Sequence, residues 1–202
     1  MMTNKSKNPN NFFRNYFNLQ INTINQIDIK KIIKISQILE RAIKKNKNIF
    51  VAGNGGSASV SNHFLCDFNK GIKLSSGKKL KPKVISLTNS IELITAISND
   101  INYNKIFSFQ LENYYKTGDV VFAVSCSGTS KNIIDLLKFA KSKKLEIIFI
   151  SGFNKSNKNP YTKNFINLNC KNYGITEDIF STFMHMISQW IRYKNSKKKE
   201  IL

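Results

Sequence analysis

The chain has 202 residues, of which 41% are hydrophobic and 11% are aromatic. This length and composition predict one globular domain with additional helices and exclude general disorder. No apolar run approaches the roughly 18–20 residues that a membrane span needs, and residues 1–11 lack the apolar core of a secretory signal. The three cysteines, Cys66, Cys126 and Cys170, have no CxxC spacing, which fits a reducing compartment, so we expect a cytoplasmic protein.

The net charge is +20, from 32 basic and 12 acidic residues, and such a charge raises the question of nucleic-acid binding. The lysines are spread along the whole chain, however, and no helix-turn-helix or zinc-finger spacing accompanies them. We therefore interpret most of this charge as solvated surface, which would attract anionic metabolites such as phosphate esters.

The predicted elements begin with helices. Apolar residues in 11–47 recur near the helical period of 3.6 residues, with a break expected around residues 25–28. Short apolar runs then predict five buried strands, at residues 48–52, 83–87, 119–124, 146–150 and 164–169. Helices are predicted at residues 58–70, 91–97, 105–116, 130–143 and 176–193, and loops at 71–81 and 153–162.

Strands and helices alternate along the chain, which predicts a mainly parallel sheet with helices on both faces. We therefore expect the α/β class: a three-layer αβα sandwich around a five-stranded sheet, with a flavodoxin-like arrangement. In this division residues 1–47 form a helical extension, residues 48–193 form the α/β domain and residues 194–202 form a basic tail.

Two loops combine features that suit a phosphate group. The first, Gly53-Asn54-Gly55-Gly56-Ser57, directly follows a predicted strand and precedes a helix. Glycines permit positive φ and close backbone approach, and the free N–H groups at a helix start favour an anion. An ordinary strand-to-helix turn needs about one glycine, so we prefer the phosphate interpretation.

The second loop, residues 125–130 with the sequence Ser-Cys-Ser-Gly-Thr-Ser, has the same position after a strand and before a helix. Its four hydroxyls can donate to phosphate oxygens. Ser130 could instead serve only as a helix N-cap, which would leave the other three hydroxyls unexplained. The P-loop pattern is absent. Since ligands bind at the carboxyl ends of parallel strands, the two loops predict a phosphorylated small molecule.

The chain has only two histidines, and each has a carboxylate at helical spacing. Asp67 follows His63 by four residues, about 40° around the helix, and Glu177 precedes His185 by eight residues. Two such helices predict a divalent-metal site of two nitrogens and two oxygens, or an acid and a base for proton transfer. A lone histidine on an apolar helix is otherwise usually a packed core residue.

Residues 51–71, 87–100 and 118–130 resemble the SIS (sugar isomerase) domain family, and within it the phosphoheptose isomerases, over about residues 30–193. The resemblance implies an aldose–ketose isomerase. It would convert sedoheptulose 7-phosphate to D-glycero-D-manno-heptose 7-phosphate through an enediol, which supplies heptose for cell-surface glycans. The alternatives are a non-catalytic SIS protein, which senses a sugar phosphate or acts as a protein-binding adaptor, and a nucleic-acid-binding protein.

The family's functional positions map onto named residues here. The implied substrate-binding residues are Asn54, Gly55, Gly56, Ser57, Asn99, Asp100, Ser125, Cys126, Ser127, Ser130 and Glu177. The implied zinc ligands are His63, Asp67, Glu177 and His185, with Asp67 and His185 as the acid–base pair. In the family the N-terminal helices pack between subunits, which implies a homotetramer with sites at subunit interfaces. No membrane partner is expected.

Several positions depart from the family pattern. Asp67 replaces the usual glutamate and shortens its reach by ~1.5 Å, about one C–C bond. Glu177 replaces the usual glutamine, and its added negative charge should tighten binding of a divalent cation. Cys126 stands where threonine is common, and Phe180 stands where histidine is common. Asp67 cannot be both a firm ligand and a free base, so either the metal is loosely held or His185 does most of the proton transfer.

Overall fold

The computed structural model describes residues 8–154 and 156–196. At its centre lies a five-stranded sheet in the order β2-β1-β3-β4-β5, in which every neighbouring pair is parallel. The strands are β1 (Asn48–Ala52), β2 (Lys83–Ser86), β3 (Val120–Ser125), β4 (Glu146–Ser151) and β5 (Asn164–Asn167). All six residues of β3 are buried, as expected for a central strand covered on both faces.

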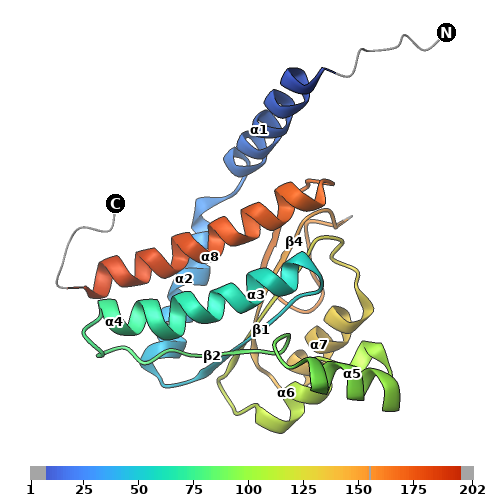
Figure 1. Cartoon of the computed structure of the whole chain (residues 1–202). Helices are drawn as coiled ribbons and strands as arrows, with labels where there is room; N and C mark the ends of the chain where they lie inside the picture. The colour runs from blue at the N-terminus through green and yellow to red at the C-terminus, as the bar shows by residue number, and fades with distance from the viewer. Residues whose placement is uncertain (1–7, 155, 197–202) are drawn as a thin grey trace.

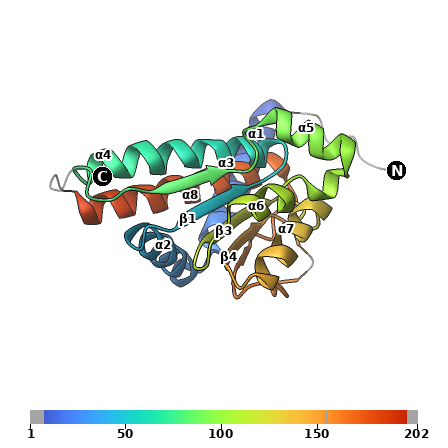
Figure 2. The same cartoon turned by 90° about the horizontal axis from the view of Figure 1, so that it is seen from below.

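The helices cover the sheet on both faces (Figures 1 and 2). They are α1 (Pro9–Asn25), α2 (Ile29–Lys44), α3 (Gly56–Cys66), α4 (Lys73–Ser75), α5 (Ile91–Asp100), α6 (Ser108–Tyr114), α7 (Lys131–Ser142) and α8 (Tyr173–Asn195). A π-helical segment, η1 (Asp67–Ile72), joins α3 to α4, and a short 3₁₀ helix, η2 (Tyr103–Lys105), follows α5. Among the described residues, no helix is both long and apolar enough to cross a membrane.

The core is divided by the sheet, because successive side chains of a strand point to opposite faces. On β1, Ile49 and Val51 pack with α2, α3 and α8, whereas Phe50 and Ala52 pack with α6 and α7. These two clusters of buried residues make the three layers that the alternation of strands and helices predicts. The α/β prediction is therefore confirmed, including the number of strands.

Several element boundaries differ from the prediction. The expected break at residues 25–28 is present, since Asp28 caps α2 by accepting a hydrogen bond from the Lys30 amide at 2.9 Å. Residues 71–81 were expected to form a loop, but helical structure continues through η1 and α4 to Ser75. Helix α8 also extends two residues into the predicted basic tail, and residues 197–202 lie outside the described ranges.

Helix α1 projects beyond the three layers (Figure 1). It packs against α8, where the Tyr16 hydroxyl donates to Asp178 Oδ2 at 3.4 Å. Much of its apolar surface stays exposed, including Phe12, Phe13 and Phe17. A single chain therefore leaves this helix without an apolar partner for most of its surface.

The extension of α8 is held by Glu40, a buried carboxylate on α2. Glu40 receives hydrogen bonds from Lys194 at 2.7 Å and Asn195 at 3.3 Å, and it pairs with Lys44 at 2.8 Å. Burial alone would raise the pKa of Glu40, but the bonds from Lys194, Lys44 and Asn195 outweigh it and lower this pKa to about 2. The carboxylate thus ties the end of α8 to α2.

We expect Glu40→Gln to destabilise the fold at neutral pH by about 1–3 kcal/mol, because two ammonium groups lose their anion. The folded pKa lies below the unfolded value of about 4.5, so the stabilisation is present above pH 4.5. It should disappear as the pH falls from about 4.5 to 2. Urea unfolding of both proteins across this range measures the effect, with the exposed Glu112→Gln as control; a constant difference at every pH would contradict it.

Candidate functional site

Both predicted phosphate loops lie at the carboxyl edge of the sheet. Strands β1 and β3 are neighbours, with Ala52 paired to Ala123, so the loops that follow them emerge side by side. In the sheet, β2 lies on the outer side of β1, whereas β4 lies on the outer side of β3, so the strand order runs in opposite directions from this pair. Such a reversal of strand order is the place where open parallel sheets bind ligands.

The glycine-rich loop has the geometry that its composition predicts. Gly55 has φ +54°, a conformation that favours glycine, and a Cβ on Gly53 would lie 2.5 Å from the Ser57 carbonyl oxygen. Helix α3 begins at Gly56 with no side chain capping its N-terminus. Its first amides are therefore open to an anion. Ser57 is buried, with its Oγ 3.8 Å from Cys126 Sγ.

In the serine-rich loop three hydroxyls converge. Ser130 Oγ lies 3.3 Å from Ser125 Oγ and 3.4 Å from Ser127 Oγ. Ser130 stands at the N-cap position of α7, but its side chain makes no capping hydrogen bond. The interpretation of Ser130 as an ordinary N-cap therefore does not apply. Three hydroxyls around one point, at the start of a helix, suit the oxygens of a phosphate group.

An amide pair that the sequence analysis missed joins the two loops. Asn54 and Asn132 exchange hydrogen bonds of 2.9 and 2.8 Å through their side chains, and Asn132 is almost fully buried. The Tyr103 hydroxyl donates to Asn54 Oδ1 at 3.2 Å. The side-chain amide of Asn54 thus holds the glycine-rich loop against α7. Asn132 lies in the first turn of a predicted helix, and nothing in its local sequence distinguishes it from a surface residue.

The expected sugar-contacting residues Asn99 and Asp100 lie at the exposed end of α5. Asn99 donates to Asp100 Oδ1 at 2.8 Å, so these two side chains bond to each other. It is Tyr103, three residues later in η2, that reaches the glycine-rich loop. The predicted substrate-binding residues near the end of α5 therefore do not reach the glycine-rich loop themselves, and Tyr103, which was not predicted, contacts it.

Glu177, on the first turns of α8, faces the two loops. Its carboxylate occupies the space beside Gly56, where a Cβ would lie only 2.1 Å from Oε2. Cys126 Sγ lies 3.7 Å from Glu177 Oε1. Burial raises the pKa of Cys126 to about 11, and the negative charge of Glu177 contributes to that rise. Cys126 is therefore a neutral thiol at physiological pH, and in this structure it donates to the Glu177 carboxylate.

His63, Asp67 and His185 meet where α3 and η1 pack along α8. Asp67 lies between the two imidazoles, with Oδ1 3.6 Å from His63 Nε2 and Oδ2 3.5 Å from His185 Nε2. The two rings are edge to face, with centroids 4.9 Å apart. Asp67 is the first residue of the π-helical segment, a kind of distortion frequent at functional sites.

These three residues fit a divalent metal ion. Each offers one ligand atom, and the three atoms lie within 4.8 Å of one another. Asp67 Oδ2 is buried without a hydrogen-bond partner among the described residues, and a cation would satisfy it. Two imidazole nitrogens and one carboxylate oxygen are a common ligand set for catalytic metals, which keep a position open.

The expected fourth ligand, Glu177, stands apart from this cluster. It precedes His185 by eight residues on α8, about 12 Å along the helix axis. Its carboxylate lies between Gly56 and Cys126 instead of beside the histidines. Spacing along one helix could not show which neighbour the side chain of Glu177 would contact.

Comparison with known proteins identifies the family to which the chain belongs. A model of the SIS domain family matches residues 12–152. The chain belongs to this family. A probable phosphoheptose isomerase from Thermoplasma acidophilum is 34% identical to this SIS domain over 83% of this chain and 91% of its own length. The family match ends before α8, so Glu177 and His185 lie outside it.

Solved structures agree with this SIS fold. A phosphoheptose isomerase from Francisella tularensis superposes with a TM-score of 0.77 at 22% identity, covering 90% of this chain and 95% of that one. A phosphoheptose isomerase from Neisseria gonorrhoeae gives a TM-score of 0.77 at 21% identity, covering 90% and 97% of the two chains. The likeness extends well beyond residue 152 and includes the fold around the site.

Proposed function

We propose that this SIS domain is a phosphoheptose isomerase, which converts sedoheptulose 7-phosphate to D-glycero-D-manno-heptose 7-phosphate for cell-surface glycan synthesis. The observation that carries the proposal is the placement of His63, Asp67 and His185 beside a phosphate-binding edge. His63 lies six residues along α3 from Ser57, about 9 Å. That separation suits a substrate whose phosphate and reacting carbons are at opposite ends. The relatives named phosphoheptose isomerase support the same activity.

In this proposal the two loops bind the phosphate. The open N-termini of α3 and α7 and the hydroxyls of Ser57, Ser125, Ser127 and Ser130 would donate to its oxygens. The carboxylate of Glu177 is the one negative group placed against these loops by the contacts above, and it would repel a phosphate that came too near Gly56. We infer that it sets the inner limit of the phosphate position. Asn99 and Asp100 remain proposed contacts for the sugar hydroxyls.

The isomerisation moves one proton between neighbouring carbons. A base removes a proton from C1 of the ketose and leaves an enediolate, and the carbonyl oxygen at C2 takes up a proton. Return of a proton to C2 and loss of the O1 proton give the aldose. We assign these transfers to Asp67 and His185, whose facing atoms lie 3.5 Å apart, so that a proton can pass between them.

We further propose that the bound metal is zinc, held by His63, Asp67 and His185. When bound, a divalent ion would stabilise the negative charge that develops on the substrate oxygens. Asp67 has one oxygen toward each histidine. Since Asp67 and His185 would serve both as ligands and as the acid–base pair, the ion must be held loosely enough for them to exchange protons with the substrate.

The acid–base cluster also favours an enzyme over a sugar-phosphate sensor or adaptor. A sensor needs the two phosphate loops, which hold the ligand, but it has no use for a carboxylate placed between two imidazoles. Pairing of a partly buried carboxylate with two histidines is instead typical of sites that bind metal or transfer protons.

We propose a homotetramer with sites at subunit interfaces. Exposed apolar side chains of α2 and α8 line a hollow of about 320 Å³, which includes Ile29, Ile33, Met186 and Trp190. Together with the exposed face of α1, this surface is larger than a monomer normally leaves in water. A second copy of the chain would cover it. We also propose a cytoplasmic location, because all three cysteines are unpaired.

Incubation of the purified chain with sedoheptulose 7-phosphate should give an aldose heptose 7-phosphate detectable by NMR. Asp67→Asn should lower turnover by at least about 100-fold, because the proton acceptor is lost. The exposed Glu112→Gln on α6 is the matched control and should keep full turnover. Near-normal turnover by Asp67→Asn contradicts the assignment, and ligand stabilisation without product indicates a sensor.

Zinc binding can be measured by equilibrium dialysis. We expect His63→Asn to weaken zinc affinity by at least about tenfold, since one of three ligands is removed. Glu177→Gln is the informative comparison: it should leave the affinity unchanged if Glu177 stands outside the ligand set. An equal loss in both variants would restore the four-ligand site, and zinc binding unaffected by His63→Asn would refute the site.

Light scattering at micromolar concentration should report four chains. Trp190→Asp combined with Ile33→Asp should dissociate the assembly, because two charges would have to be buried at the interface. Leu74→Asp, which changes an exposed apolar residue on α4, serves as the control. A monomeric wild-type chain would contradict both the tetramer and the shared site.

A further inference from the structure

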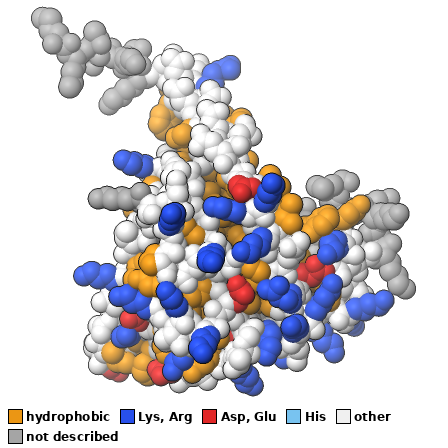
Figure 3. Space-filling model, turned by 180° about the vertical axis from the view of Figure 1, so that it is seen from behind, with side chains coloured by type: hydrophobic (Ala, Val, Ile, Leu, Met, Phe, Trp, Pro, Cys, Tyr) orange, Lys and Arg blue, Asp and Glu red, His pale blue; other side chains and the backbone are white. Residues whose placement is uncertain are grey.

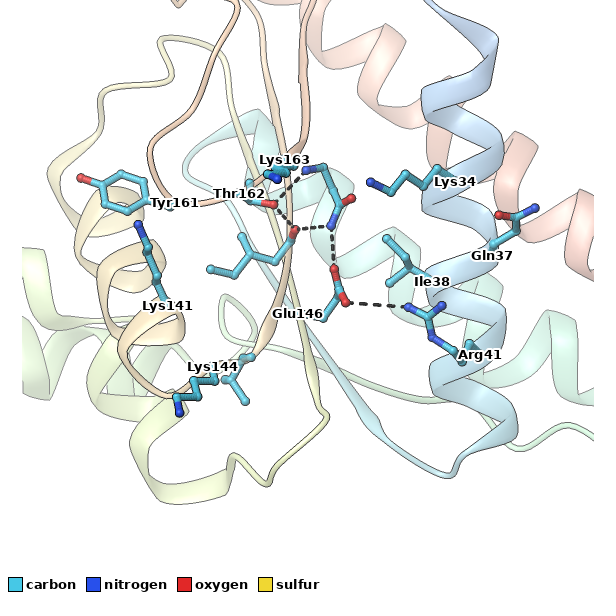
Figure 4. Close-up of a pocket in the computed structure, with 13 residues that line it drawn as sticks. Lys34, Gln37, Ile38, Arg41, Lys141, Lys144, Glu146, Tyr161, Thr162 and Lys163 are labelled. Atoms are coloured by element: carbon cyan, nitrogen blue, oxygen red, sulfur yellow. Dashed lines mark hydrogen bonds and ion pairs between the residues drawn. The ribbon is translucent and has the colours of Figure 1, made fainter.

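A second hollow lies at the opposite edge of the sheet from the candidate active site. It is formed where β4 and β5 begin, between α2 on one side and the end of α7 on the other (Figure 4). Its cavity volume is about 650 Å³, within the range of small-molecule sites. It is separated from the phosphate loops by the length of β4, roughly 17 Å. The hollow is therefore independent of the isomerase site.

The lining of this hollow is strongly basic. Five cationic side chains surround it: Lys34, Arg41, Lys141, Lys144 and Lys163. They come from three separate parts of the chain, namely α2, α7 with the turn after it, and the segment before β5. Figure 4 shows Lys34 and Arg41 across the hollow from Lys141 and Lys144. Cations gathered from distant parts of the sequence around one concave surface make a high local positive potential.

The one carboxylate in the hollow, Glu146, is already neutralised. Arg41 lies 3.7 Å from Glu146 Oε2, and Asn164 Nδ2 donates to Glu146 Oε1 at 2.7 Å. These bonds hold Glu146 at the floor, between α2 and α7 (Figure 4). It therefore leaves the remaining cations of the hollow uncompensated.

Three of those cationic side chains have no polar partner among the described residues. The side chains of Lys34, Lys144 and Lys163 form no hydrogen bond or ion pair with any residue in the ranges 8–154 and 156–196. Lys141 differs, because its ammonium donates to the Pro160 carbonyl at 2.7 Å. The hollow thus holds three exposed, unpaired ammonium groups over a built floor.

We propose that this hollow binds a small molecule that carries two or more linked phosphate groups. One phosphate cannot neutralise three ammonium groups that approach from different walls, whereas a di- or triphosphate presents several charges along a few ångströms. A neighbouring hollow of about 400 Å³ shares Arg41 and Lys144 and adds Lys45 and Lys47. It extends the basic surface on one side, where the further end of such a ligand would lie.

A nucleic acid is the less favoured occupant. On the face seen in Figure 3 the basic side chains are spread broadly, but those named above surround a hollow of about 650 Å³. Nucleic-acid surfaces usually combine a long stripe of charge with aromatic platforms for bases, and Tyr161 is the single aromatic residue that lines this hollow. A compact polyphosphate matches the shape and charge better.

The test is calorimetric titration of the full chain with tripolyphosphate at about 0.15 M ionic strength. Lys34→Gln combined with Lys163→Gln should weaken binding at least about tenfold. The control, Lys73→Gln combined with Lys79→Gln, removes the same charge from exposed lysines elsewhere and should leave the affinity unchanged. Both double variants should keep the circular dichroism spectrum and the unfolding midpoint of the wild type, which shows that they are folded. ATP titrated in parallel should bind and should lose affinity in the same variant.

Three results would overturn the proposal. Equal weakening in both double variants would mean that only net charge attracts the anion. Competition of tripolyphosphate with the sugar phosphate, unchanged by Lys34→Gln and Lys163→Gln, would place the anion at the serine-rich loop. Tighter binding of a single-stranded oligonucleotide than of tripolyphosphate, lost in the same variant, would identify a nucleic-acid surface instead. Because binding is measured directly, these outcomes do not depend on the isomerase activity.

Discussion

The parallel pairing of β1 with β3 is the interaction on which the candidate site depends. It aligns Ala52 with Ala123, so that the glycine-rich and serine-rich loops leave the sheet at the same edge and beside each other. Helices α3 and α7 both start there, and their N-termini add two partial positive charges to the same space. The Asn54–Asn132 amide pair then locks the loops together.

The cluster of His63, Asp67 and His185 depends on a second contact, in which α3 and η1 pack against α8. Phe64 and Phe68 are fully buried, and their rings lie 4.0 Å apart between centroids. Each follows a site residue by one position, so burying this pair turns His63 and Asp67 toward α8. His185 completes the cluster from the other helix. Core packing thus orients the polar groups, and α3 sets their distance from the glycine-rich loop at its start.

The two edges of the sheet carry hydrogen-bond donors of different kinds. At the carboxyl edge the donors of the two loops are backbone amides, hydroxyls and the Cys126 thiol, and the Glu177 carboxylate lies against them. At the amino edge the donors are lysines and arginine around Glu146. Neutral donors allow discrimination by geometry, whereas ammonium groups respond mainly to the amount of negative charge.

The sequence by itself determined the fold class, the five strands and the position of the glycine-rich and serine-rich loops, because apolar periodicity and glycine or serine content are local signals. It also paired His63 with Asp67 from their helical spacing. Only the tertiary structure decided that Glu177 turns to Gly56 and Cys126, and that Asn132 and Tyr103 hold Asn54. These contacts join residues about 50 to 120 positions apart, and which side chains meet across such a distance is set by the packing of α8, η2 and α7 against the loops, which no local pattern encodes.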